Sequence, residues 1–170
     1  MPIFIFYFCW WKLRKTIGVD LNLQFPAGWN QAKEIKYSQG FNKPSPRDFV
    51  GYGPLTEPES LAIYNFTLSY NFRLVIAYHT QGQEIYWQFQ DFNPPNSEYI
   101  GNRLAQSSGY ILAKTPYNSS FAGYKDWFIQ NYNRPGYTIE AGIGENPLPI
   151  SQFDEIYNDN IGILIFGAIL

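Results

Sequence analysis

The sequence is short of the side chains that most often carry metal and redox chemistry, with one cysteine, one methionine and one histidine in 170 residues. With Cys9 alone, the chain can form neither an intrachain disulfide nor a cysteine-based zinc site. Thiol catalysis is also disfavoured, because Cys9 lies in an apolar run far from His79, the only histidine.

Charge is scarce as well: charged residues make up 15% of the chain and the formal net charge is −2. This balance gives no electrostatic reason to expect nucleic acid as a partner. Aromatic residues reach 19%, which argues against disorder and indicates either an aromatic core or a face that binds sugars or peptides. A chain of this length is expected to form one domain.

Long apolar runs are absent too. The most apolar stretch, Met1 to Trp11, is too short to span a bilayer and lacks the positive residues that precede the apolar region of a signal peptide. We therefore expect no transmembrane segment, and we interpret this stretch as a buried strand or as an atypical start.

The segment Arg73 to Tyr78 is short, apolar and rich in β-formers, and it predicts a strand covered on both faces. His79 follows it directly. In open α/β sheets, ligands bind just beyond the carboxyl ends of such strands. A single histidine there is either a structural imidazole or a ligand or acid/base group. The nearby pair Tyr86-Trp87 is assigned to the core rather than to a sugar platform.

Other segments predict the remaining elements. Leu61, Tyr64, Leu68 and Phe72 recur at helical spacing and predict a face that packs on the sheet. Glu140 lies within an apolar segment, where a carboxylate is costly unless it is paired or functional. The first half of the chain predicts a strand at 18–29 that ends in a loop, a long loop at 30–54, and a helix from a Thr56 cap to about Asn71. The second half predicts helices at Ser97 to about Leu112 and Ala122 to Tyr132, and a strand at Tyr137 to Ala141. A last helix is predicted from Ser151, and its buried face holds Phe153, Ile156, Tyr157, Ile161 and Leu164.

Five segments, taken in order, resemble the zinc carboxypeptidase family of carboxypeptidase A-like metallopeptidases. Within that family they are most similar to the bacterial γ-D-glutamyl-L-diamino acid endopeptidases, which cut peptidoglycan stem peptides. The segments are GVDLNLQFPAGW at Gly18, PSPRDFVG at Pro44, PLTEPES at Pro54, YHTQGQEIYW at Tyr78 and PGYTIEAGIGENPLP at Pro135.

The resemblance implies an α/β fold with a mixed sheet flanked by helices, one zinc ion, and peptidoglycan-derived peptides as partners. It makes His79 the third zinc ligand and Glu140 the carboxylate that activates the zinc-bound water. A zinc ion lowers the pKa of its water and polarises the scissile carbonyl, and a glutamate carries the proton to the leaving amine. The implied reaction is amide hydrolysis.

The resemblance also suggests residues on the substrate side. Asn22 stands where the family has the asparagine of an asparagine-arginine pair that holds a substrate carboxylate, but Leu23 replaces the arginine. Tyr117 is close to the position of the family's mobile tyrosine. The guanidinium of Arg47 matches a carboxylate in geometry, and the alternative is a solvated loop arginine.

The chain departs from the family at its front, where an H-x-x-E motif should supply the first two zinc ligands. We therefore expect residues 1–17 to be an atypical or mis-started segment, and 18–170 to be the C-terminal part of a catalytic domain that is inactive alone. Two alternatives remain: a general metallocarboxypeptidase, which Leu23 disfavours, and a non-catalytic module that binds cell-wall peptides. The sequence does not indicate a compartment.

Overall fold

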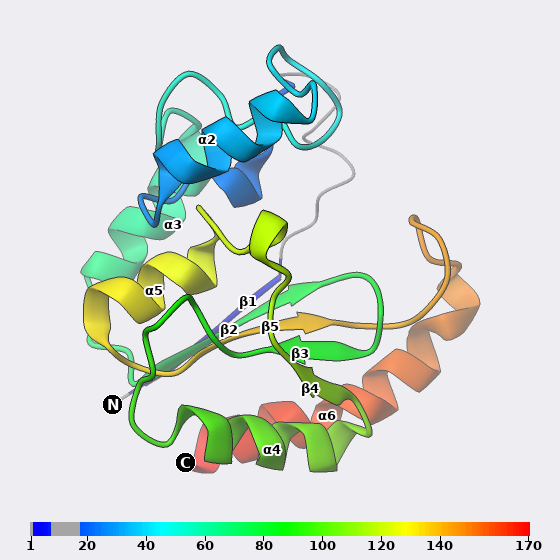
Figure 1. The fold of residues 1–170 in the computed structure, drawn as a ribbon. Coiled ribbons are helices and arrows are strands. Elements are labelled where there is room, and N and C mark those ends of the chain that lie inside the picture. The colour runs from blue at the N-terminus through cyan, green and yellow to red at the C-terminus, as the bar shows by residue number, and fades with distance from the viewer. Residues whose placement is uncertain (1, 8–17) are drawn as a thin grey trace.

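The computed structural model of the chain describes residues 2–7 and 18–170. Its five-stranded sheet has the order β1-β2-β5-β3-β4, and Figure 1 shows it at the centre of the molecule. The sheet is mixed, because β3 pairs with β5 in the antiparallel sense while the other pairs are parallel. The strands are β1 (Ile3–Tyr7), β2 (Leu74–His79), β3 (Glu84–Tyr86), β4 (Ile111–Ala113) and β5 (Gly136–Glu140).

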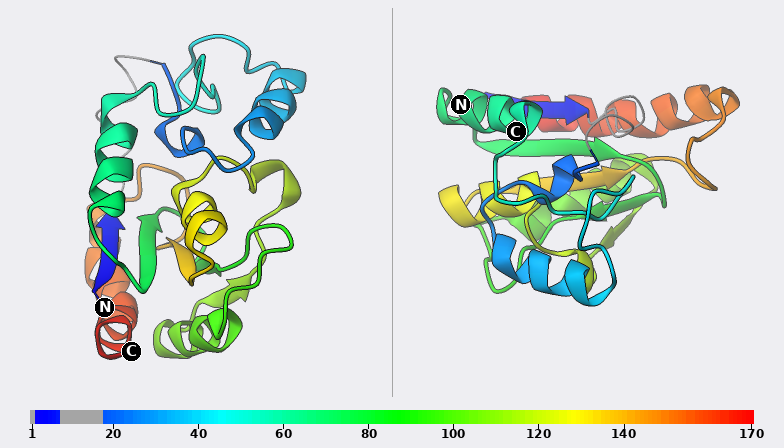
Figure 2. Two further views of the ribbon diagram at one scale, coloured as in Figure 1. Left: turned by 90° about the vertical axis from the view of Figure 1, so that its left-hand side faces the viewer. Right: turned by 90° about the horizontal axis from the view of Figure 1, so that it is seen from above.

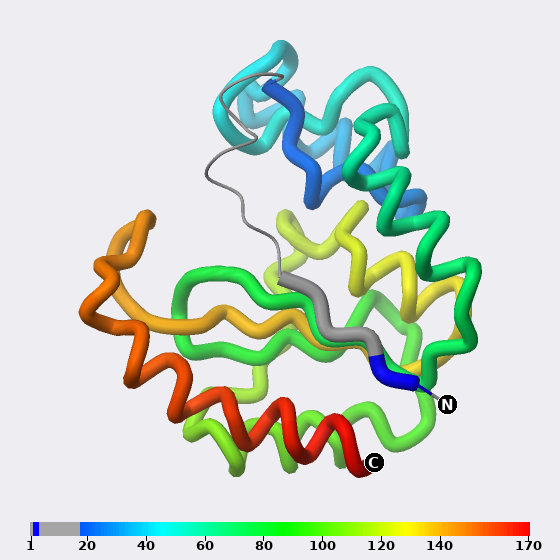
Figure 3. Tube along the Cα trace, turned by 180° about the vertical axis from the view of Figure 1, so that it is seen from behind, coloured from blue at the N-terminus to red at the C-terminus, as the bar shows by residue number. Residues whose placement is uncertain are grey.

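Helices cover both faces of this sheet and form a three-layer arrangement. In Figure 1 and Figure 2, α2, α3 and α5 lie on one face, and α4 and α6 lie on the other. Figure 3 shows α4 and α6 side by side from behind, in agreement with their many contacts. The helices are α2 (Trp29–Ser38), α3 (Pro58–Leu68), α4 (Ser97–Ser108), α5 (Tyr124–Tyr132) and α6 (Phe153–Ile169), with short 3-10 helices at Leu21–Leu23, Tyr117–Ser119 and Ile150–Gln152.

Strand β2 is the clearest confirmed prediction. Val75 and Ala77 pack in the core cluster under α2, α3 and α5, whereas Leu74, Ile76 and Tyr78 pack in the cluster toward α4 and α6. The strand is buried on both faces, as its continuous apolar run predicts. The strand predicted at 137–141 is β5, and the helix predicted at 122–132 is α5.

The strand predicted at 18–29 is wrong. The carboxylate of Asp20 accepts a hydrogen bond from the Asn22 backbone N–H (3.2 Å), which favours the 3-10 turn at Leu21–Leu23. Gly28 then adopts a left-handed φ of 64° and begins α2, so the first part of the predicted loop at 30–54 is helical. Any other residue at position 28 would place its Cβ only 2.7 Å from the Phe121 ring, so the close packing there also requires glycine.

The helix predicted from Thr56 exists as α3, and Tyr64 and Phe72 pack in the core as predicted, but the cap and the rest of the buried face differ. The Thr56 hydroxyl donates to the Gln24 side chain instead of capping the helix, and Glu57 occupies the N-cap position. Leu61 and Leu68 are exposed, whereas Ser60 and Thr67 are buried. Ser60 donates to Leu21 O and Thr67 shares a hydrogen bond with Tyr124, so polar contacts orient the helix. The helix predicted at 97–112 ends at Ser108, before β4.

The buried face predicted for the last helix is confirmed at Ile156 and Leu164, which pack against the core, but it is rotated toward Asn160 and Ile163. Phe153 (58% exposed) and Tyr157 (51% exposed) lie on the surface, while Asn160 and Ile163 are buried. Gly162 explains the rotation, because a Cβ there would lie 3.0 Å from Ser107 of α4. The small residue lets the two helices approach closely. Of the described helices, none is long and apolar enough to cross a membrane.

This rotation leaves an apolar stripe on α6 that is exposed along its length. The stripe residues, spaced four apart, are Phe153, Tyr157, Ile161, Ile165 and Ile169. Contiguous exposed apolar surface favours association. We predict that the purified chain self-associates and that Ile165→Lys shifts it toward the monomer, as measured by sedimentation velocity.

The matched control is Asn158→Lys, which adds the same charge at an exposed polar position of the same helix. This variant should associate like the unmodified chain. A monomeric unmodified chain, or an equal effect of the two substitutions, would contradict the prediction.

Candidate functional site

An open cleft of about 1400 Å³ lies over the C-terminal ends of β2 and β5, on the sheet face that also carries α5. The strand ends contribute His79 and Glu140 to its lining. The segment 18–48 contributes a wall that includes Asn22 and Arg47, and the start of α5 contributes Lys125. The cleft therefore occupies the position at which a ligand site was predicted from the end of β2.

His79 and Glu140 lie side by side in this cleft. Strands β2 and β5 pair in parallel, and their register places His79 opposite Glu140 at the last paired position. The Ala141 N–H donates to the His79 carbonyl oxygen (2.9 Å) and continues the pairing past the strand end. The structure thus brings together the two predicted residues that lie 61 positions apart in the sequence.

Glu140 has a proton affinity that differs from that of an ordinary glutamate. Burial, and in second place the carboxylate of Glu84, raises the pKa of Glu140 from its ordinary 4.5 to about 7. Glu84 is opposite Glu140 because β3 and β5 pair in the antiparallel sense. The Tyr86 hydroxyl donates to Glu84 Oε2 (2.5 Å) and holds this second carboxylate in place. A carboxyl group with a pKa near 7 can both accept and release a proton at neutral pH.

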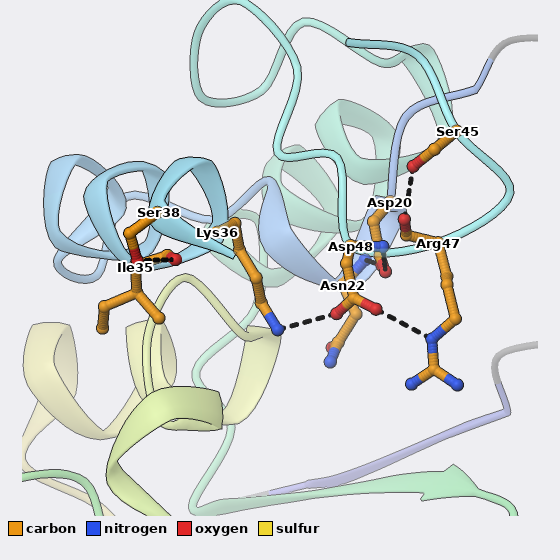
Figure 4. Close-up of polar contacts among 8 residues, drawn as sticks. All are labelled: Asp20, Asn22, Ile35, Lys36, Ser38, Ser45, Arg47 and Asp48. Atoms are coloured by element: carbon orange, nitrogen blue, oxygen red, sulfur yellow. Dashed lines mark hydrogen bonds and ion pairs between the residues drawn. The ribbon is translucent and has the colours of Figure 1, made fainter. Parts of the chain in front are cut away.

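Charged side chains on the opposite wall form a chain of ion pairs (Figure 4). Asp48 accepts from Lys36 Nζ (2.7 Å) through one oxygen and from Arg47 Nε (2.8 Å) through the other. Although burial opposes its ionisation, the two cations hold the pKa of Asp48 below its ordinary value. Because only Nε of Arg47 is engaged by Asp48, the two terminal nitrogens of the guanidinium remain able to pair with a ligand carboxylate.

Asp20 holds Asn22 next to the ion pairs of Asp48. One Asp20 oxygen accepts from the Asn22 N–H and the other from the Asp48 N–H (2.9 Å), so Asp20 joins the turn to the loop. Figure 4 shows the Asn22 amide and the Arg47 guanidinium pointing to the same side, toward the strands. Leu23, in the position of the family's arginine, is 7% exposed and belongs to the core.

Tyr117 lies beside the cleft rather than in its lining. Its ring is 60% exposed and packs edge-on against Phe121, with ring centroids 5.2 Å apart. Pro116 and Ser119, on either side of it, do line the cleft. The substrate-side role predicted for Tyr117 stays a prediction.

Sequence reasoning missed several residues of the cleft. Tyr86 was assigned to the core, but it is only half-buried and lines the cleft. Glu84, which lies opposite Glu140, was missed because β3 is only three residues long and its antiparallel pairing with β5 leaves no local signal. Lys125 and Asp126 were also missed, although a lysine in the first turn of a helix is itself unusual. Both residues are buried and line the cleft. Trp87 is buried, which confirms its assignment to the core.

Comparison with known proteins settles the family. The family model of zinc carboxypeptidases matches residues 9–162. The chain belongs to the zinc carboxypeptidase family. This member is 47% identical over 163 residues to γ-D-glutamyl-L-diamino acid endopeptidase 1 of Lysinibacillus sphaericus, covering 96% of this chain and 39% of that protein.

Solved structures confirm the fold of this family member. Carboxypeptidase A from Helicoverpa armigera aligns with 90% of this chain and 42% of its own, at a TM-score of 0.69 and 20% identity. The murein-tripeptide amidase MpaA from Escherichia coli O157 aligns with 89% of this chain and 59% of its own, at a TM-score of 0.58 and 22% identity. The chain spans 39–40% of the length of the curated relatives that it matches.

The zinc ion that the family implies does not fit the described residues alone. Within 2–7 and 18–170, no three His, Cys, Asp or Glu side chains lie close enough together to hold a metal ion. A catalytic zinc ion takes three protein ligands and keeps one open position. The described part of the chain therefore offers His79 as a candidate ligand but no complete site.

The raised pKa of Glu140 predicts how stability changes with pH. Between about 4.5 and 7 the folded chain binds more protons at Glu140 than the unfolded chain, so its free energy of unfolding falls as the pH rises through this range. Glu140→Gln should abolish this fall in the free energy of unfolding. Between pH 4.5 and pH 8, the free energy of unfolding of the unmodified chain should fall by up to about 3 kcal/mol more than that of the Glu140→Gln variant.

Urea unfolding with a chelator present measures this difference. Glu145→Gln is the control, because Glu145 is an exposed carboxylate on the loop after β5. The control should keep the pH dependence of the unmodified chain. If Glu140→Gln also kept it, the group responsible would not be Glu140.

Proposed function

We propose that this chain forms part of the active site of a zinc-dependent peptidase that cleaves the γ-D-glutamyl to diamino-acid bond of peptidoglycan stem peptides. The observation that carries the proposal is the pairing of His79 with Glu140 at the adjoining ends of β2 and β5, inside the cleft. The 47% identity to an endopeptidase named for this bond supports the choice of substrate.

In this proposal Glu140 is the general base. It accepts a proton from the attacking water as the carbon-oxygen bond forms, and it then donates that proton to the amine as the carbon-nitrogen bond breaks. The burial that raises its pKa to about 7 suits both transfers at neutral pH. His79 is proposed as one metal ligand of the whole protein, with the other ligands supplied from outside the described residues.

The opposite wall is proposed to hold the peptide. Arg47 and Asn22 point toward the strands, where the guanidinium and the amide suit a carboxylate and a peptide carbonyl. Leu23 is apolar and buried in the core, so it cannot pair with a terminal carboxylate as the arginine of an asparagine-arginine pair would. This disfavours a carboxypeptidase that recognises its substrate through such a pair. An endopeptidase specificity is therefore preferred.

One observation favours a second candidate, a non-catalytic module that binds cell-wall peptides. The described residues form a cleft with cationic and amide groups but no complete metal site. Peptide binding that persists in a chelator would support this candidate.

The zinc content of the purified chain tests the ligand proposal. Because His79 is the one candidate ligand of the described residues, we expect far less than one zinc ion per chain after gel filtration, as measured by atomic emission. His79→Ala should remove the residual zinc, and Glu145→Gln should not. One tightly held zinc ion per chain, unaffected by His79→Ala, would contradict this assignment.

Hydrolysis tests the reaction. In a chimera, residues 18–170 of this chain replace the aligned segment of the Lysinibacillus sphaericus endopeptidase, which is 47% identical. The chimera should cleave a γ-D-glutamyl-diaminopimelate peptide in preference to a plain C-terminal dipeptide. Glu140→Gln should lower kcat roughly 10²- to 10⁴-fold, as expected for loss of a general base.

The control in the chimera is Lys114→Gln, an exposed position outside the cleft lining, which should leave kcat unchanged. A chimera that prefers the plain dipeptide would overturn the endopeptidase specificity. A Glu140→Gln chimera with full activity would remove Glu140 from the mechanism.

A further inference from the structure

We propose that a second pocket, at the edge of the sheet opposite the cleft, binds a small monocarboxylic acid with an apolar body, and that Arg73 pairs with its carboxylate. The inference goes beyond the proposed peptidase function, because no residue that lines this second pocket also lines the cleft. Arg73 precedes β2 and His79 ends it, so the two sites are roughly 20 Å apart at the usual rise per residue.

The second pocket lies where four segments of the fold meet. Its volume is about 390 Å³, which is within the range of pockets that hold small organic ligands. The start of β2, the start of α4, the link between α5 and β5, and the end of α6 line it. Because β2 and β5 are parallel, their starts lie together at this edge of the sheet. In Figure 3 the C-terminal end of α6 is on the opposite side of the molecule from the loop that follows β5.

Arg73 supplies a positive charge that the fold holds in place. Its Nη2 donates to Gly167 O (3.1 Å) and to Ala168 O (3.2 Å), near the C-terminal end of α6. A cation is favourable at this end of a helix, so the two contacts orient the guanidinium before a ligand arrives. The backbone N–H of Arg73 donates to Pro2 O (3.0 Å), which ties the residue to the segment that leads into β1.

The guanidinium keeps donors that the fold does not use. It carries five N–H donors, and the two hydrogen bonds that it makes within the described residues both come from Nη2. Nε is buried and has no hydrogen-bond partner in that part of the chain. Most buried donors in folded proteins are paired, and an unpaired one costs free energy until a ligand accepts from it. A carboxylate fits this role, because its two oxygens match two N–H groups of a guanidinium.

The remaining lining is mainly apolar and favours an apolar body on the ligand. Side chains without charge or hydrogen-bonding groups make up most of it: Leu74, Pro95, Ile100, Pro135 and Leu170. None of the described residues in this lining is an aspartate or a glutamate, so no side-chain carboxylate of the lining competes for the guanidinium. A second charge on the ligand would face apolar side chains at a cost in free energy. The ligand class is therefore a monocarboxylic acid with an alkyl or aromatic body.

Hexanoate and hexanamide test the proposal on the unmodified chain. The two probes have the same alkyl body, and only hexanoate carries a charge. Their affinities are measured by chemical-shift titration of the ¹⁵N-labelled chain. Because a charge-assisted contact is gained, we expect hexanoate to bind at least about tenfold tighter than hexanamide. The amide signals of Leu74 and Ile100 should shift, and those of His79 and Glu140 should not.

Tyr99→Glu tests the location without altering Arg73. Tyr99 lines the second pocket and is 64% exposed, so the substitution should leave the fold intact. Its negative charge repels the carboxylate of hexanoate or occupies the guanidinium, and the affinity for hexanoate should fall about tenfold. Tyr52→Glu is the matched control, because Tyr52 is 78% exposed and lines neither pocket. This control should bind hexanoate like the unmodified chain.

Two further variants identify the cation. Arg73→Gln should bind hexanoate and hexanamide equally, and circular dichroism with the thermal midpoint establishes that it is folded. If the loss of the contacts to α6 unfolds this variant, Tyr99→Glu still decides the location. Arg47→Gln removes the guanidinium of the cleft wall and should leave the affinity for hexanoate unchanged.

Several outcomes would overturn the carboxylate site. These are equal binding of hexanoate and hexanamide by the unmodified chain, binding of neither, and a folded Arg73→Gln variant that still prefers hexanoate. Loss of hexanoate binding in Arg47→Gln, without an effect of Tyr99→Glu, would place the ligand in the cleft instead. The peptidase proposal is tested separately by hydrolysis, so it stands or falls independently of these results.

Discussion

The arrangement of the cleft depends on the parallel pairing of β2 with β5. Both strands are buried between helical layers, so a slip of one residue would exchange the side chains that pack against the two layers and disrupt the packing of each. The fixed register places His79 beside Glu140. The antiparallel pairing of β3 with β5 then brings Glu84 opposite Glu140, and this adds to the burial that raises the pKa of Glu140. The chemistry of the site follows from the register of the sheet.

The charges around this centre are held in pairs that organise the cleft more than they stabilise the fold. Asp48 fixes Arg47 on one wall, and Asp126 fixes Lys125 on the other side. The Arg47 side chain is 74% exposed and the Lys125–Asp126 pair is buried, and ion pairs of either kind contribute little net stability. Two carboxylates also organise backbone, since Asp20 accepts from the Asp48 N–H and Asp126 accepts from the Gly123 N–H at the start of α5.

The sequence predicted this centre better than it predicted its surroundings. A continuous apolar run predicts a strand covered on both faces, and the polar residue that ends it marks the sheet edge, which is how His79 was predicted. Glu140 was predicted because a carboxylate within an apolar segment is costly unless it is paired or functional. Apolar spacing identified only part of the buried faces of α3 and α6, because Ser60, Thr67 and Gly162 face the interior through hydrogen bonds or close helix contact. It failed for 18–29 because the Asp20 side chain favours a turn. Such contacts join distant segments and leave no local pattern.

The groups proposed to react and the groups proposed to bind the peptide lie on different elements of the fold, and this affects specificity. Glu140 and His79 lie on strands whose register the core fixes, whereas Arg47 lies on a loop. Under the proposed function, substitutions in the loop would therefore alter which peptide is bound without moving Glu140, the proposed base. At the start of β5, Gly136 lets α5 pack closely on the strand, because a Cβ there would lie 3.2 Å from Ile129 and 3.3 Å from Lys125 Cγ. This glycine thus helps to set how close the helix lies to the strand that carries Glu140.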